Sequence, residues 1–259
     1  MFLRDVLKGV EYNIGAGPKA QEPDIDITAV SDDSRTVTPG SIFVALEGHS
    51  KDGRSFIDEA LSKGAAAIVS DPGLCVPGAG GVRKVSVSDV RGALASIAKN
   101  FYGNPSSKLK VIGITGTNGK TTVTYLIESI SKAAGARAGV IGTINHRSNG
   151  VARPAKNTTP GSLELAKLLS EMVDDGVKYA AMEVSSHALD QGRISGVDLD
   201  VGLFTNITSD HLDYHKTKAE YFKAKSRIFE HLKDNGVAIL NYDDKKAIST
   251  GPLLIGIGR

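Results

Sequence analysis

One segment joins an apolar strand, a glycine-rich turn and the start of a helix, and it restricts the possible folds more than any other feature. Residues 111–122 read Val-Ile-Gly-Ile-Thr-Gly-Thr-Asn-Gly-Lys-Thr-Thr. Apolar residues then recur on one face at helical spacing, at Val123, Leu126, Ile127 and Ile130. Gly135 stands where such a helix would end. A strand, a glycine-rich turn and a helix in this order point backbone N–H groups and the positive end of a helix dipole toward a bound anion. The segment therefore predicts an α/β domain with a phosphate-binding loop.

The turn supplies seven candidate nucleotide-binding residues: Gly116, Thr117, Asn118, Gly119, Lys120, Thr121 and Thr122. In a loop of this kind the lysine reaches the outer phosphates, and the hydroxyl of Thr121 can ligate Mg²⁺. The strict pattern is not met, because Ile114 and Thr115 stand where its first glycine is expected and the glycine is displaced to position 116. A purely structural turn between strand and helix is the alternative. We expect the loop to bind a nucleoside triphosphate.

Composition narrows the class of protein. The 259 residues are 41% hydrophobic and 23% charged, which is typical of a globular protein with real cores. The net charge of +2 is too small to indicate nucleic acid as a partner. A single cysteine, Cys75, excludes an internal disulfide and fits a reducing compartment. The first eight residues have no signal-peptide core, and no run reaches the roughly 18 apolar residues of a membrane helix. We therefore expect a cytoplasmic, soluble protein without a membrane partner.

Two α/β domains are predicted. The turn-rich segment 104–107 suggests a boundary, so that residues 1–107 form a small α/β domain and residues 108–259 a larger one. The first contains strand-like runs at 42–46, 66–69 and 82–87 and helix-like stretches at 56–63 and 90–100. In the second, strands at 109–114, 137–142, 177–182, 199–204 and 236–241 alternate with helices at 120–134, 162–174 and 218–232. Such alternation predicts a mostly parallel sheet that binds ligands at the carboxyl ends of its strands.

Several polar residues follow the predicted strand 177–182. Glu183 comes first, and a carboxylate at a strand end across from a phosphate loop is a natural Mg²⁺ ligand. Gln191 and Arg193 follow, adding an amide and a guanidinium that could fix an anionic substrate. This strand end is therefore a candidate site for both metal and substrate.

The segment Asn157-Thr-Thr-Pro160 admits two interpretations. It precedes a predicted helix, so Asn157 or Thr159 could simply be the N-cap, with Pro160 at the first helical position. Alternatively, its side chains belong to a binding site. The residues alone leave both interpretations open.

Two of the six histidines lie in the segment 206–215, directly after the strand that ends at residue 204. His211 stands beside Asp210 at this strand end, and metal ligation there is about as plausible as a capping or solvated role. Further along, Lys225 lies on or beside the apolar face of a helix that carries Phe222, Ile228, Phe229 and Leu232. A solvated lysine is the ordinary interpretation of that position.

Taken in order, these segments resemble the Mur ligases, enzymes that join amino acids to the UDP-muramoyl peptide precursor of peptidoglycan. The matching segments are Gly116-Thr-Asn-Gly-Lys-Thr-Thr122, Asn157-Thr-Thr-Pro160, Glu183-Val-Ser-Ser-His-Ala-Leu189, Gln191-Gly-Arg193, Asp210-His-Leu-Asp-Tyr-His215 and Ala224-Lys225. Residues 33–35, 39–46 and 48–56 resemble the UDP-binding domain of the type that adds the third peptide residue. The resemblance covers residues 25–243.

The resemblance implies an activity and its cofactors. In this family ATP phosphorylates the carboxylate of the UDP-N-acetylmuramoyl dipeptide, UDP-N-acetylmuramoyl-L-alanyl-D-glutamate, and the amine of a free amino acid attacks the resulting acyl phosphate. The implied cofactors are ATP and Mg²⁺, with a carbamylated lysine at position 225. The implied catalytic residues are Lys120, Glu183, His211 and Lys225.

The family also implies particular ligand sets. Thr121 and Glu183 would hold one Mg²⁺, and His211 with carbamylated Lys225 a second. The muramoyl peptide would contact Asn157, Thr158, Thr159, Ser185, Gln191 and Arg193. The UDP end would contact Ser34, His49, Ser50 and Lys51.

Three alternatives to the Mur ligase interpretation remain. A folylpolyglutamate synthetase shares the phosphate loop but would lack the segment 34–56. A GTPase would need an Asn-Lys-x-Asp motif, which the sequence does not contain. A non-catalytic nucleotide-binding module is the third. The sequence does not reveal whether the third amino acid is meso-diaminopimelate, lysine or another.

Members of this family are much longer than 259 residues and carry a C-terminal domain that selects the amino acid and closes over ATP. The resemblance therefore suggests that the chain is a truncated piece of such a ligase, with an incomplete central domain. We expect this piece by itself to bind ATP weakly and to be inactive as a ligase.

Overall fold

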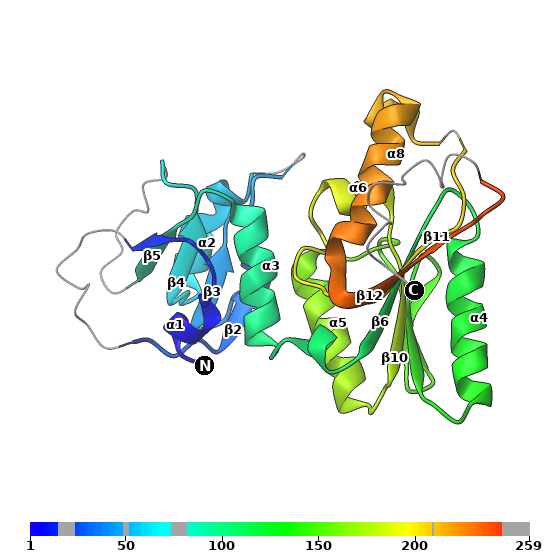
Figure 1. Cartoon of the computed structure of the whole chain (residues 1–259). Coiled ribbons are helices and arrows are strands. Elements are labelled where there is room, and N and C mark those ends of the chain that lie inside the picture. Colours follow the sequence, from blue (N-terminus) through cyan, green and yellow to red (C-terminus); the bar gives the residue numbers. More distant parts are fainter. Residues whose placement is uncertain (15–23, 49–51, 74–81, 209, 245–259) are drawn as a thin grey trace. The chain divides into compact units, whose positions relative to one another are not determined.

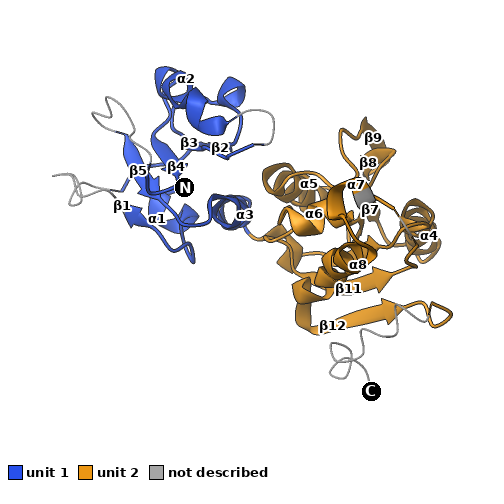
Figure 2. Ribbon diagram, turned by 90° about the horizontal axis from the view of Figure 1, so that it is seen from above, with its two compact units in different colours: residues 1–103 blue, residues 104–259 orange. Residues whose placement is uncertain are grey.

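The computed structural model describes residues 1–14, 24–48, 52–73, 82–208 and 210–244. The chain forms two compact units, Met1–Gly103 and Asn104–Arg259, which Figure 2 shows in different colours. Each unit is built around its own sheet.

The sheet of the first unit has five strands in the order β1-β5-β4-β3-β2. Its strands are β1 (Asn13–Ile14), β2 (Ala29–Ser31), β3 (Ser41–Val44), β4 (Ala67–Ser70) and β5 (Arg83–Ser86). All neighbours are parallel except β1, which runs antiparallel to β5. The helices are α1 (Leu3–Val6), α2 (Ile57–Ser62) and α3 (Val90–Phe101), with 3₁₀ turns at Ser34–Thr36 and Gly53–Phe56. Strands β3 and β4 are buried at every residue. Because both faces of these parallel strands are covered, their sequences are mostly apolar rather than alternating.

The sheet of the second unit has seven strands in the order β12-β11-β6-β10-β7-β8-β9. Five of them are parallel: β6 (Lys110–Thr115), β7 (Ala138–Ile141), β10 (Tyr179–Glu183), β11 (Leu199–Phe204) and β12 (Leu232–Leu240). The antiparallel strands β8 (Asn145–Ser148) and β9 (Val151–Pro154) extend the sheet beyond β7. The predicted α/β architecture with a mostly parallel sheet is thus confirmed.

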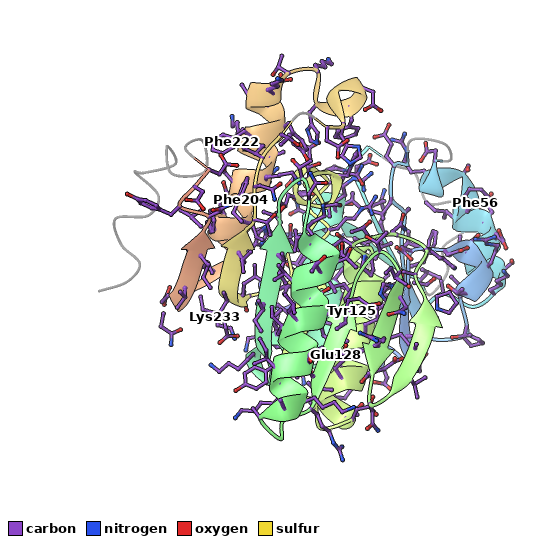
Figure 3. All side chains as sticks on the ribbon, turned by 90° about the vertical axis from the view of Figure 1, so that its right-hand side faces the viewer. Phe56, Tyr125, Glu128, Phe204, Phe222 and Lys233 are labelled. Carbon is purple, nitrogen blue, oxygen red and sulfur yellow. The ribbon has the colours of Figure 1, made fainter. Side chains whose placement is uncertain are left out.

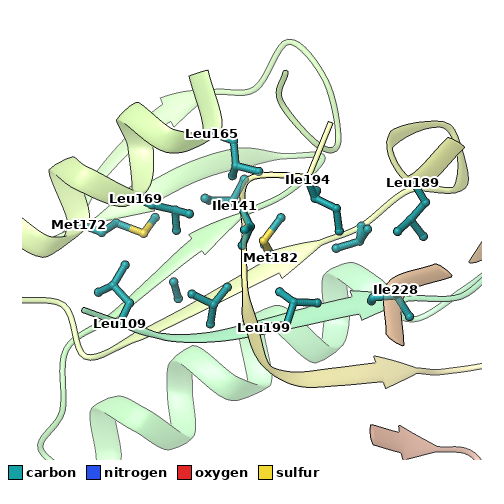
Figure 4. Packing of buried hydrophobic residues seen from close by; sticks show 14 of the residues in the cluster. Leu109, Ile141, Leu165, Leu169, Met172, Met182, Leu189, Ile194, Leu199 and Ile228 are labelled. Atoms are coloured by element: carbon teal, nitrogen blue, oxygen red, sulfur yellow. The ribbon is translucent and has the colours of Figure 1, made fainter. Parts of the chain in front are cut away.

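Helices cover both faces of this sheet. Figure 1 shows α4 (Lys120–Ala133) and α5 (Ser162–Asp174) on opposite sides of it. The α5 side holds the main core, which Figure 4 shows in part and to which α5 contributes Leu165, Leu169 and Met172. Short helices α6 (Ser186–Asp190) and α7 (Leu212–His215) precede α8 (Lys218–Ser226) in the chain, and 3₁₀ turns lie at Pro105–Ser107 and Arg227–His231.

Two helices differ from the sequence expectation. The predicted helix 218–232 ends at Ser226, and a 3₁₀ turn carries the chain into β12, which begins at Leu232 rather than 236. Phe222 of α8 packs its ring 6.1 Å from that of Phe204 at the end of β11 (Figure 3). The apolar face expected on α4 is not buried, because Leu126 and Ile130 are 54% and 67% exposed.

The end of α4 is as predicted. Gly135 has a φ of +73°, and its N–H donates to the carbonyl of Lys132 while the N–H of Ala136 donates to that of Ser131. This pair of bonds is a Schellman motif, in which glycine takes the left-handed position at no steric cost. Among the described residues, no helix is long and apolar enough to cross a lipid bilayer.

Candidate functional site

The candidate site lies in the second unit, where parallel strands end. β6 lies between β10 and β11, and both neighbours pair with it in parallel register, Glu183 opposite Ile114 and Phe204 opposite Thr115. The next strand in the chain, β7, lies beyond β10, so the chain leaves β6 toward one side and returns for β11 on the other. Such a reversal of strand order opens a crevice at the carboxyl edge of the sheet.

The phosphate loop connects β6 to α4 at this edge. Gly116 has a φ of +139° and Gly119 a φ of +87°. A Cβ at Gly116 would lie 1.9 Å from Oγ1 of Thr205, so only glycine fits. The loop is held from the end of β11, where the carbonyl of Asn206 accepts the N–H of Thr117 and its Oδ1 accepts that of Asn118. Two strand ends therefore fix the conformation of the loop.

Two lysines meet on one carbonyl of this loop. Lys120 Nζ donates to the carbonyl oxygens of Gly116 and Thr117, each at 2.9 Å, and Lys225 Nζ donates to that of Gly116 at 2.8 Å. Lys225 is only 2% exposed and lies 4.8 Å from the ring centre of Tyr221. Burial, followed by the charge of Lys120, lowers the pKa of Lys225 to about 7, and burial also lowers the pKa of Lys120. A solvated surface lysine at position 225 is therefore excluded.

Glu183 ends β10 and is 1% exposed. Its Oε1 accepts from Thr121 Oγ1 at 2.9 Å and from the N–H of Thr143 at 3.0 Å, and its Oε2 accepts from Thr143 Oγ1 at 3.1 Å. No lysine, arginine or histidine of the described chain forms an ion pair with this carboxylate. A buried carboxylate without a cationic partner is costly, and a bound cation would offset that cost.

A cavity of about 320 Å³ connects these groups. Eleven of the predicted residues line it: Thr117, Asn118, Gly119, Lys120, Thr121, Thr122, Thr158, Glu183, Ser185, His211 and Lys225. Gly116 does not line the cavity itself, but its carbonyl accepts hydrogen bonds from Lys120 and Lys225, which do. The structure thus brings the phosphate loop and the candidate metal ligands to one cavity.

The chemistry of this donor set suits Mg²⁺. Glu183 and Thr121 offer hard oxygen atoms, and Mg²⁺ is usually held by one or two carboxylates together with substrate phosphates rather than by an all-protein cage. The described part of the chain contains no cluster of three or more His, Cys, Asp or Glu side chains arranged around a metal position. Lys225, as an ammonium, would repel a cation, so its predicted role as a ligand requires the modified side chain.

Three histidines gather beside the cavity. The ring of His187 on α6 lies 4.8 Å from that of His211 and 5.6 Å from that of His215. His211 has a φ of +51°, and its Nε2 lies 3.5 Å from Asp210 Oδ2. Burial lowers the pKa of both His187 and His215. No sequence pattern groups His187 with the other two.

The other predicted substrate residues differ in burial and in hydrogen bonding. Asn157 is exposed, whereas Thr159 is fully buried and donates to the carbonyl of Glu183 while accepting from the N–H of Ser185. Arg193 Nη1 donates to the Thr159 carbonyl at 3.0 Å, and its Nε and Nη2 donate to Gln191 Oε1. The capping interpretation of this segment is wrong, because α5 begins at Ser162 with Gly161 as its N-cap.

The predicted UDP-binding residues belong to the first unit. Ser34 is buried and donates to Glu59 Oε2 at 2.7 Å, and Lys63 Nζ bridges Glu59 and the Ser34 carbonyl. Ser34 and Glu59 line a cavity of about 630 Å³. His49, Ser50 and Lys51 lie outside the described residues.

Three residues that line the larger unit's cavity were not predicted: Thr143, Ser186 and Tyr221. Thr143 follows β7, so the rule that sites lie at strand ends could have identified it. Tyr221 precedes Lys225 by one helical turn, and its hydroxyl lies 3.3 Å from Thr117 Oγ1. Ser186 Oγ is buried without a hydrogen-bond partner, which no sequence pattern reveals.

Comparison with known families agrees with this geometry. Residues 114–251 match the Mur ligase middle domain, and residues 26–102 match the catalytic domain of the Mur ligase family. The first match alone covers more than half of the 259 residues.

Individual relatives are similar over most of the chain. The UDP-N-acetylmuramoyl-L-alanyl-D-glutamate–2,6-diaminopimelate ligase of Caldanaerobacter subterraneus is 44% identical over 95% of this chain and 49% of its own length. The enzyme of the same name from Geobacillus kaustophilus is 49% identical over 85% of this chain and 45% of its own length. The chain thus spans about half the length of the curated relatives it matches.

Solved structures of ligases of this family are also similar to the chain. A structure of a ligase with that name is 31% identical with a TM-score of 0.70, and the match covers 89% of this chain and 47% of that one. The MurF ligase of Thermotoga maritima in complex with ADP is 27% identical with a TM-score of 0.61, covering 89% of this chain and 49% of that one.

Proposed function

The chain belongs to the Mur ligase family, and from this membership we propose that it forms the UDP- and ATP-binding part of an ATP-dependent ligase of peptidoglycan precursor synthesis. The substrate would be UDP-N-acetylmuramoyl-L-alanyl-D-glutamate, as the names of its relatives indicate. The same names favour 2,6-diaminopimelate as the amino acid that is added.

In the proposed reaction, the terminal phosphoryl group of ATP passes to the substrate carboxylate, giving an acyl phosphate and ADP. The amino group of the incoming amino acid then attacks the acyl carbon and releases phosphate. Catalysis of phosphoryl transfer depends chiefly on positioning and on electrostatic stabilisation of the transferred group. The observation that best supports this function is the buried Glu183 carboxylate beside the phosphate loop, hydrogen-bonded to the hydroxyl of Thr121.

The loop residues and Lys120 would bind the phosphates of ATP. Lys120 already reaches over the loop to Gly116 and Thr117, so it needs only to turn from these carbonyls to an arriving phosphate. Thr121 and Glu183 would hold one Mg²⁺, and His211 with Lys225 a second. Bound Mg²⁺ would neutralise negative charge on the phosphoryl oxygens. Thr158, Ser185 and the pair Gln191–Arg193 would hold the muramoyl peptide.

Lys225 would act as a carbamate. Its neutral amine attacks CO₂, forms a C–N bond and releases one proton, and this turns an ammonium into an anionic oxygen ligand that suits Mg²⁺. The pKa of about 7 supports this role, because a large fraction of the amine is neutral at physiological pH. Incubation with carbon-13-labelled bicarbonate should give a carbamate NMR signal that is absent from Lys225→Arg. An unlabelled wild-type chain would contradict the proposal.

The UDP end of the substrate would bind the first unit, around Ser34 and residues 49–51. Isothermal titration of the whole chain with UDP-N-acetylmuramate should show weaker binding for Ser34→Ala and His49→Ala. Thr28→Ala, an exposed change in the same unit, is the control. Unchanged affinity in both variants would show that these residues do not form the UDP site.

Nucleotide binding provides the central test. We expect the chain to bind ATP more tightly with Mg²⁺ than without it, and Lys120→Ala to lose at least about tenfold in affinity, since it removes a charged hydrogen-bond donor. Lys132→Ala, an exposed change in the last turn of α4, is the matched control. ATP binding without any response to UDP-N-acetylmuramoyl dipeptide would instead favour a non-catalytic nucleotide-binding module.

A further inference from the structure

Thr143 makes two hydrogen bonds to the Glu183 carboxylate, more than any other described residue. We propose that Thr143 is a positioning residue that fixes the Glu183 carboxylate for its metal ion. This inference rests on the proposed function, because the metal belongs to the nucleotide site. Thr143 lies at the cavity, two residues after the end of β7, and its hydroxyl also lies 3.0 Å from that of Thr158 on the substrate side.

Thr143 contacts both carboxylate oxygens. Its N–H donates to Oε1 at 3.0 Å and its hydroxyl to Oε2 at 3.1 Å, so the two bonds together determine the plane of the carboxylate. Groups that hold metal-binding carboxylates in this way orient the ligand and raise its affinity for the metal.

The third donor to Glu183, Thr121, would be shared with a bound metal. Thr121 Oγ1 donates to Oε1 at 2.9 Å, but Thr121 is itself a candidate Mg²⁺ ligand, so it would turn its oxygen toward the ion. The two bonds from Thr143 come instead from a residue that is not itself a candidate ligand, so they can fix the carboxylate independently of the metal. Thr143 is therefore the residue whose loss should loosen Glu183 in the loaded site.

The residue before Thr143 supports this close contact. A Cβ at Gly142 would lie 2.3 Å from Glu183 Oε1, so the backbone approaches the carboxylate more closely than any other residue type allows. The glycine thereby permits the N–H of Thr143 to reach Oε1 directly. Two successive residues are thus adapted to the position of one carboxylate.

Two substitutions separate the hydroxyl from the rest of the residue. Thr143→Val keeps the shape and the N–H bond but removes the hydroxyl, and Thr143→Ser restores it. Because Thr143 is exposed, both variants should fold. Thr217→Val, which removes the N-cap of α8 outside the cavity, is the control for loss of stability alone.

The test measures metal binding rather than activity. Each variant of the 259-residue chain is titrated with ADP in the absence of metal, and then with Mn²⁺ in the presence of ADP. Electron paramagnetic resonance measures the free Mn²⁺. We expect Thr143→Val to weaken Mn²⁺ binding roughly 10- to 100-fold, as is usual for loss of a residue that orients a metal ligand. Metal-free ADP affinity should not change, and Thr143→Ser should stay within about threefold of the wild type.

Other results would overturn the proposal in distinguishable ways. Wild-type Mn²⁺ affinity in Thr143→Val, or equal losses in the Val and Ser variants, would show that the hydroxyl does not position Glu183. A loss in Thr217→Val as large as that in Thr143→Val would assign the effect to stability. A wild-type chain that binds ADP but gains nothing from Mn²⁺ would remove the role of Thr143 and leave nucleotide binding intact. Failure to bind ADP at all would contradict the proposed function itself.

Discussion

Lys225 carries an amine inside the protein, and this has a consequence for stability. In the unfolded chain its pKa takes the ordinary lysine value, whereas in the folded chain burial lowers it to about 7. Between these two values the unfolded chain binds more protons, so raising the pH stabilises the folded state. Without CO₂, the free energy of unfolding should rise by about 1 kcal/mol from about pH 7 to about pH 8. Urea titrations at several pH values should show this rise, and Lys225→Met should abolish it.

Gly116 and Gly135 both have positive φ, but their surroundings differ. A Cβ at Gly116 would clash with Thr205, whereas one at Gly135 meets nothing within 4 Å. Gly116→Ala should therefore cost about 3 kcal/mol or more and abolish ATP binding, while Gly135→Ala should cost only about 1 kcal/mol and leave binding unchanged. Thermal unfolding and calorimetric titration of both variants would check this. Equal losses of stability would mean that the Thr205 contact is unimportant.

At the scale of single residues, the sequence is informative where the backbone conformation or a strand end dictates the residue type. It correctly placed Glu183 at the end of a strand and the loop glycines between a strand and a helix, because both positions follow from strand-to-helix geometry. It could not identify Ser186, because an unpaired buried hydroxyl depends on what packs around it. Nor could it decide whether Lys225 is buried, since that depends on the packing of α8 above the phosphate loop.

In helix α4, large apolar side chains are exposed while small polar side chains are buried. Ile130 is 67% exposed, whereas its neighbour Ser131 is 8% exposed and Thr124 is fully buried. Ile130→Lys should therefore change stability by less than about 0.5 kcal/mol, since it is a surface substitution in the last turn of a helix. Ser131→Lys should cost about 2 kcal/mol or more, because it forces a charge into the packed face. Denaturant unfolding of the two variants tests this, and a larger loss for Ile130→Lys would contradict the observed orientation of the helix.

At the scale of elements, strongly periodic segments were predictable and short ones were not. Helix α5 and strand β11 have the predicted bounds, because each combines a buried face with clear ends. The hairpin β8–β9 was missed, since β9 is exposed throughout and has no apolar pattern. Helix α8 was predicted too long because the apolar residues Ile228 and Phe229 continue its pattern into the following 3₁₀ turn.

For the whole molecule, the separate cores of the two units lead to a paired prediction. Leu169 lies in the core of the second unit and Ile68 in that of the first, and both are buried. Each change to alanine should cost about 2–5 kcal/mol. In hydrogen-exchange mass spectrometry, Leu169→Ala should speed exchange only in peptides after residue 104, and Ile68→Ala only in peptides before it. Acceleration throughout the chain by either change would show that the units do not unfold separately.

The central position of β6 in its sheet also has a consequence for folding during synthesis. β6 leaves the ribosome early, yet its partners are β10, which begins about 70 residues later in the chain, and β11, about 90 residues later. Pairings this distant in sequence form slowly, because a long loop must close before any contact stabilises it. The first unit, whose parallel strands lie close together in sequence, can fold while the second is still being translated. The phosphate loop is therefore among the first parts of the second unit to be synthesised and among the last to be shaped.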